Sequence, residues 1–178
     1  MKIGSVVQVR TFSEYVVKTP VDRSDGYVPV SGIAPGTYVS IKAQEGKVIG
    51  IVINALHNVK EDYLPYLPEG KQEVFLPYAT DYRSSYLVIT GIGNTLETGP
   101  SYDLKFTPGI NDLAEVMEPE EIRAFHLCQG KASFAYYRRL QQSVDSATVT
   151  SAIDNAARAM PECLPMLKAL KKLTERKL

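Results

Sequence analysis

Residues 35–52, PGTYVSIKAQEGKVIGIV, constrain the fold most, because they contain a complete β-hairpin with its turn. Bulky and polar side chains alternate over 38–41, Gly46 supplies the turn, and 48–53 is a β-branched run interrupted only by Gly50. A glycine inside such a strand indicates a tight bend or a close backbone approach, as at the corner of a barrel. The hairpin therefore predicts part of a small β-barrel.

Other segments in the first part of the chain also have the composition of strands. Residues 3–10 alternate valine with polar side chains, which is typical of a half-buried strand. Because Pro29 cannot donate to a central ladder, the residues around it predict only a short edge strand. Besides the hairpin, the expected strands are 3–10, 15–18, 27–30, 85–93 and 102–107. About five to seven short strands suit a closed or nearly closed barrel, which removes exposed edges.

Residues 55–84 form a predicted insertion in the barrel, rich in tyrosine, proline and charge. Tyrosines are good anchors at protein interfaces, so Tyr63, Tyr66 and Tyr78 are candidate partner-binding residues. The alternative is a long surface loop whose rings only cover the end of the barrel.

The last part of the chain has helical periodicity. Pro119, followed by two glutamates, is typical of a first helical turn, where negative charge is favoured. Apolar residues then recur at helical spacing over about three or four short segments. On the last of these, Leu167, Leu170 and Leu173 form an apolar stripe that is a second candidate contact surface.

The predicted fold class is α+β, with a barrel domain over 1–110 and a helical domain over 111–178. The 178 residues are enough for a barrel with its own core plus a helical appendage. Lys and Arg together number 20, and so do Asp and Glu together, so the formal net charge is zero. The total charge therefore does not indicate nucleic acid or an anionic membrane as the partner.

Cysteine usage and the N-terminus indicate the compartment. Cys128 and Cys163 are too few for a disulfide framework or a metal cluster, so they are interpreted as reduced thiols. Residues 1–5 have no signal-peptide character, and no apolar run is long enough to cross a bilayer. We therefore expect a cytoplasmic protein.

Candidate catalytic residues are few. His57 has only loop carboxylates nearby in sequence, a weak set for a metal. His126 and Cys128 are two residues apart, so on a helix their side chains diverge and cannot readily activate one another. The favoured interpretation is one surface histidine and one buried cysteine. We expect no metal, no cofactor and no enzymatic activity.

Basic residues provide an alternative function. Arg138 and Arg139 are flanked by tyrosines, and arginines with aromatic rings can hold single-stranded nucleic acid. The possible nucleic-acid contacts are Arg138, Arg139, Lys168, Lys171 and Lys172. The other interpretation is an amphipathic helix with its arginines in water.

The order of these motifs resembles the HerA/ATP-synthase barrel, or HAS barrel. The resemblance is carried by residues 3–7, 36–41, 46–52, 88–93, 108–109 and 119–122. In that family the barrel precedes an ATPase domain, crowns a hexameric ring and, in DNA-repair members, helps to contact a nuclease. This chain departs from the pattern because residues 108–178 are too few for an ATPase domain and no phosphate-binding loop is present.

The resemblance implies a stand-alone barrel that does no chemistry. We accordingly predict a non-catalytic assembly or adaptor module, which self-associates or docks on a ring ATPase or nuclease. The alternative is a small nucleic-acid-binding protein that uses a barrel groove and the basic C-terminal helices.

Overall fold

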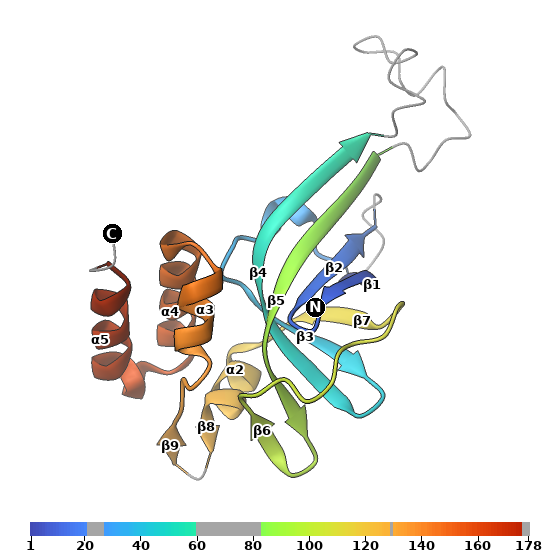
Figure 1. The fold of residues 1–178 in the computed structure, drawn as a ribbon. Coiled ribbons are helices and arrows are strands. Elements are labelled where there is room, and N and C mark those ends of the chain that lie inside the picture. The colour runs from blue at the N-terminus through green and yellow to red at the C-terminus, as the bar shows by residue number, and fades with distance from the viewer. Residues whose placement is uncertain (21–26, 60–82, 129, 176–178) are drawn as a thin grey trace.

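The computed structural model describes residues 1–20, 27–59, 83–128 and 130–175. Within them, six antiparallel strands follow the order β2-β1-β7-β3-β4-β5, and pairing of β2 with β5 closes them into a barrel (Figure 1). These strands are β1 (Lys2–Thr11), β2 (Glu14–Thr19), β3 (Tyr38–Ala43), β4 (Gly46–Val59), β5 (Arg83–Leu96) and β7 (Leu113–Val116). A barrel followed by helices confirms the predicted α+β fold class.

The remaining elements are short strands and helices. The strand β6 (Gly99–Ser101) pairs with the end of β5. The strands β8 (Leu127–Cys128) and β9 (Lys131–Ala132) pair with each other. The helices are η1 (Val30–Gly32), α2 (Pro119–His126), α3 (Tyr137–Ser143), α4 (Ser146–Ala159), η3 (Pro161–Cys163) and α5 (Leu164–Glu175). Helices α2 to α5 gather on one side of the barrel rather than around it (Figure 1).

Strands β3 and β4 form the predicted hairpin. They pair from Tyr38↔Ile51 to Ala43↔Gly46, and Gly46 has a φ of 148°, which favours glycine at the turn. The expected close approach occurs at Gly50, where a Cβ would lie 2.5 Å from Cγ2 of Ile89 on β5. Any larger residue at this position would push β4 away from β5.

Alternation along the strands divides the apolar side chains between two cores. Val39 and Ile41 point into the barrel and belong to its interior core. Tyr38 and Ile51 point outward and share a second core with helical residues such as Ala152. The helices therefore pack on the β3–β4–β5 face of their own barrel.

Two of the predicted strands are wrong. Residues 27–30 contribute only an isolated bridge between Tyr27 and Lys2, and η1 follows. Residues 102–107 contain no strand. Their backbone hydrogen-bonds to the Asn94 side chain and not to a neighbouring strand. Its Oδ1 accepts from the N–H of Lys105 at 2.6 Å, and its Nδ2 donates to the carbonyl of Phe106 at 3.3 Å.

The sixth barrel strand is β7, which lies between β1 and β3. Ala114 pairs with Gly4 on one side and with Ile41 on the other, and its side chain is buried in the barrel interior. The barrel therefore extends to Val116, and the predicted boundary between residues 110 and 111 is wrong. This boundary would have removed a strand from the middle of the sheet.

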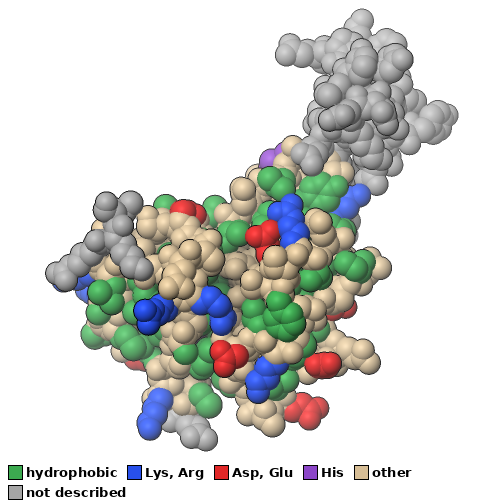
Figure 2. All heavy atoms as spheres, viewed as in Figure 1, with side chains coloured by type: hydrophobic (Ala, Val, Ile, Leu, Met, Phe, Trp, Pro, Cys, Tyr) green, Lys and Arg blue, Asp and Glu red, His purple; other side chains and the backbone are tan. Residues whose placement is uncertain are grey.

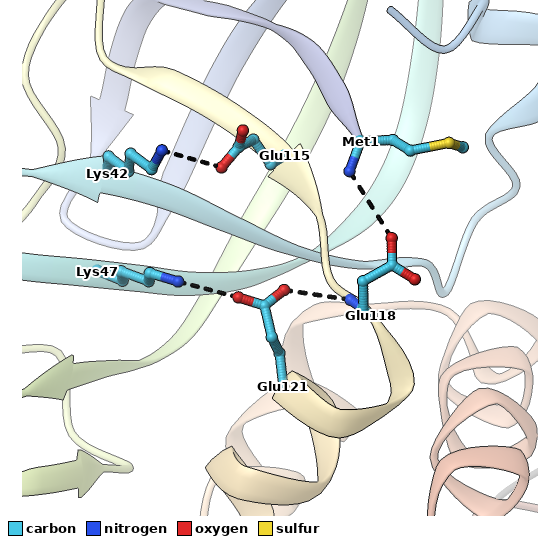
Figure 3. Close-up of polar contacts among 6 residues, drawn as sticks. All are labelled: Met1, Lys42, Lys47, Glu115, Glu118 and Glu121. Carbon is cyan, nitrogen blue, oxygen red and sulfur yellow. Dashed lines mark hydrogen bonds and ion pairs between the residues drawn. The ribbon is translucent and has the colours of Figure 1, made fainter. Parts of the chain in front are cut away.

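Polar contacts fix the start of α2 against the barrel (Figure 3). Pro119 is the first residue of α2, as predicted. Glu121 accepts a hydrogen bond from the backbone N–H of Glu118 at 3.2 Å and forms an ion pair with Lys47 of β4 at 2.9 Å. The N-terminal amine of Met1 lies 3.9 Å from the Glu118 carboxylate. The first helical turn is thus connected to both β4 and the start of β1.

Candidate protein-interaction surface

Helix α5 packs against α4 through one face. Leu167 is 1% exposed within the second core, and Leu170 packs partly against the same core. Lys171 Nζ lies 2.8 Å from Oδ1 of Asp154 on α4. The predicted leucine contact surface is therefore wrong for Leu167, because the stripe folds back on its own chain. Leu173, at 51% exposed, is not among the residues of this core.

The outer face of α5 carries an exposed apolar strip. Met166 and Leu173 are exposed large apolar side chains seven residues apart, with the exposed Ala169 between them. Residues at this spacing lie on one face of a helix. This outer strip, defined by Met166, Ala169 and Leu173, is a different surface from the predicted stripe and shares only Leu173 with it.

A groove of about 200 Å³ separates α4 from α5. Its apolar lining is Ile153, Ala157, Leu164 and Leu167, and its polar lining is Asp154, Lys168 and Lys171. Leu164 is 37% exposed, so the groove joins the core to an apolar side chain at the surface. The groove and the outer strip make α5 the most apolar accessible helix surface that the structure describes.

The five predicted nucleic-acid contacts do not form one basic site. Arg139 donates through Nη2 to the carbonyls of Ile92 and Tyr102 at 2.8 and 3.0 Å, so it connects α3 to β5. Lys171 is paired with Asp154. Arg138 is exposed on α3, while Lys168 and Lys172 are exposed on α5. On the face in Figure 2, basic side chains lie among acidic and apolar ones.

A buried polar network connects the barrel to the helices. The ring nitrogen Nε2 of His126 lies 2.7 Å from the Tyr136 hydroxyl, which lies 3.0 Å from the Tyr38 hydroxyl. Nδ1 of His126 lies 2.7 Å from the Ile122 carbonyl. Burial lowers the pKa of His126 to about 4 and raises that of Tyr38 to about 12, so all three side chains are neutral near pH 7.

The sequence interpretation of His126 and Cys128 is wrong for both residues. His126 is 0% exposed and Cys128 is exposed. Helix α2 ends at His126, and Cys128 lies on β8, so the helical spacing from Phe125 does not extend to the cysteine. His57, interpreted as a loop residue, lies on β4 with Nδ1 2.9 Å from the Ser85 hydroxyl oxygen. No simple sequence signal reveals the tyrosine–histidine network.

Tyr63, Tyr66 and Tyr78 lie outside the described residues. Among the residues described, no group of three or more His, Cys, Asp or Glu side chains could hold a metal ion. No described helix is both long and apolar enough to span a membrane.

Comparison with curated proteins finds no match to this chain. A family model, described as a domain of unknown function (DUF8166), matches residues 1–159. The matched span contains the barrel and helices α2 to α4, and it ends before η3 and α5. It crosses the predicted boundary at residue 110, in keeping with the core that joins barrel and helices. The chain belongs to the DUF8166 family of domains of unknown function.

Proposed function

We propose that this chain is a non-catalytic assembly or adaptor module that docks on a protein partner. The observation that carries the proposal is the apolar outer strip of α5, where Met166 and Leu173 are exposed. Apolar side chains that gather on one exposed helix face are typical of a protein-binding surface.

The state of the candidate catalytic groups supports this proposal over an enzyme. His126 is buried and neutral, and both of its ring nitrogens are engaged in hydrogen bonds. General acid–base catalysis needs a titratable group within reach of a substrate. Among the described residues, His126 therefore contributes to the packing between the barrel and the helices.

The HAS-barrel resemblance makes a ring ATPase or a nuclease the partner class that we propose. We also propose a cytoplasmic location, on the cysteine usage and the N-terminal sequence. The nucleic-acid alternative has less support, because Arg139 and Lys171 are engaged within the chain. Arg138 and Lys168 remain exposed but lie on different helices.

Affinity capture from nuclease-treated native extract tests the proposal. The bait is the full chain, compared with Leu173→Glu and with Ile110→Glu as the matched control. Ile110 is an exposed apolar residue, 58% exposed, between β6 and β7, and the N–H of the next residue donates to the Val6 carbonyl of β1. We expect wild type and Ile110→Glu to retain a ring ATPase or nuclease and Leu173→Glu to lose it. Recovery of nucleic-acid-associated proteins only when nuclease is omitted would support the alternative.

A further inference from the structure

One edge of β4 has no strand partner among the described residues beyond Val52. Pairing with β3 ends at Tyr38↔Ile51, and the backbone of Val52 makes the last contacts, with Gly36 and Thr37. Strand β4 continues to Val59 with β5 as its partner on the other side. At this end of the barrel, β4 is therefore the edge of the sheet (Figure 1).

This edge lacks the charged residues and prolines that usually block strand pairing, and the irregularity in its pairing with β5 lies at its start, between Val52 and Asn54. Residues 53–59, INALHNV, contain no Lys, Arg, Asp, Glu, Pro or Gly. Natural edge strands are protected by charges, prolines or bulges, because free backbone N–H and C=O groups can recruit another strand. The Asn54 side chain also protects the edge, since it accepts a hydrogen bond from the N–H of Ala55 at 2.8 Å. A strand carbonyl can replace this acceptor.

We propose that the β4 edge pairs with the same edge of a second copy of this chain, antiparallel across a two-fold axis. A register centred on Leu56 uses residues 54–58, which lie beyond the irregularity at Ile53 and are as many as an ordinary strand contains. It places Leu56 opposite its own copy and Ala55 opposite His57, so no charged side chains face one another.

The surroundings of the edge favour a second copy as the occupant. An isologous contact needs a self-complementary surface, and an uncharged edge meets this condition. The chain has a formal net charge of zero, so two copies approach without long-range repulsion. Ile53, Ala55 and Leu56 are only half-buried within one chain, which leaves apolar surface to be covered by cross-strand neighbours.

The inference deepens the assembly role proposed above, but its test needs only the purified full chain. Native mass is measured by light scattering over a concentration series for wild type, Leu56→Lys and Gln44→Lys. Leu56→Lys places two like charges opposite each other, whereas Gln44→Lys adds the same charge at an exposed turn away from the edge. We expect wild type and Gln44→Lys to form dimers and Leu56→Lys to dimerise about tenfold or more weakly.

A monomeric wild type, or a dimer unaffected by Leu56→Lys, would overturn the inference without affecting partner docking through α5. Cross-linking keeps the test decisive if Leu56→Lys fails to fold. Two cysteine variants, Leu56→Cys and Gln44→Cys, are each made in a Cys128→Ser background and oxidised in parallel. Antiparallel self-pairing brings the two Leu56→Cys thiols within disulfide range, so we expect a cross-linked dimer from this variant. Equal cross-linking at residue 44 would contradict the proposed register.

Discussion

The Tyr136 hydroxyl lies 2.7 Å from Nε2 of His126, in a buried network whose hydrogen-bond directions are set at the other ring nitrogen. The Ile122 carbonyl can only accept, so it takes the Nδ1 proton of the neutral imidazole. Nε2 then accepts from Tyr136, and the Tyr136 oxygen accepts from the hydroxyl of Tyr38 on β3. The chain of hydrogen bonds thus runs from the barrel into α2.

This direction predicts unequal costs for removing the two hydroxyl groups. Tyr136→Phe leaves both Nε2 of His126 and the Tyr38 hydroxyl without a partner, which costs about 1–3 kcal/mol for each buried group. Tyr38→Phe removes one donor and leaves the Tyr136–His126 bond in place, at a cost of about 1 kcal/mol. Chemical denaturation of both variants measures the difference. Equal costs, or a larger cost for Tyr38→Phe, would contradict the assigned direction.

The buried imidazole also predicts a pH dependence of folding. The pKa of His126 is about 4 in the folded chain, below the ordinary value of 6.5, because burial disfavours the charged ring. The unfolded chain therefore binds a proton before the folded chain does. The stabilising contribution is complete above pH 6.5 and is lost as the pH falls towards 4, by roughly 3 kcal/mol.

Urea denaturation at pH 7 and pH 4.5 measures this loss. His126→Gln is the control, since an amide oxygen can accept from Tyr136 but does not titrate. We expect the stability of this variant to change much less over the same range. The Asp145 carboxylate, whose pKa is lowered by the hydrogen bond from the Thr148 N–H, loses its contribution at more acidic pH. A wild type as insensitive as His126→Gln would exclude His126 as the titrating group.

Burial predicts that truncating one leucine of α5 costs much stability and truncating another costs little. Leu167→Ala removes a side chain that is 1% exposed, so we expect a loss of about 2–5 kcal/mol in the free energy of unfolding. Leu173→Ala affects a side chain that is 51% exposed and should change the free energy of unfolding by less than about 0.5 kcal/mol. Thermal or urea unfolding distinguishes them. If Leu167→Ala were harmless, α5 would not be packed on α4 in solution.

Local signals were enough to predict the β3–β4 hairpin, because its alternation and its turn glycine lie within one short segment. Strand β7 could not be predicted in the same way. Its four residues gain strand structure only by lying between β1 and β3, which are distant in sequence. Residues 102–107 have a strand-like composition, but the side chain of Asn94 provides their hydrogen bonds.

The surface residues were predicted less well than the barrel. Arg139 is attractive as a nucleic-acid contact because it is basic and next to tyrosines, yet it binds backbone carbonyls of Ile92 and Tyr102. Leu167 and Leu173 share one helical stripe in sequence, but α4 covers only one of them. In both cases the decisive partner lies on another element of the fold, which helical periodicity cannot identify.

The contacts of Glu121 predict a difference between the two partners of its ion pair (Figure 3). Lys47→Ala removes only the 2.9 Å ion pair between partly exposed side chains, so the free energy of unfolding should fall by less than about 1 kcal/mol. Glu121→Ala also removes the acceptor of the Glu118 N–H at the start of α2, which adds about 1 kcal/mol. Urea denaturation at low and high salt separates the two effects. Salt should reduce the cost of Lys47→Ala and leave most of the additional cost of Glu121→Ala, because the capping hydrogen bond does not depend on Lys47. Equal costs at high salt would show that Glu121 acts only through its charge.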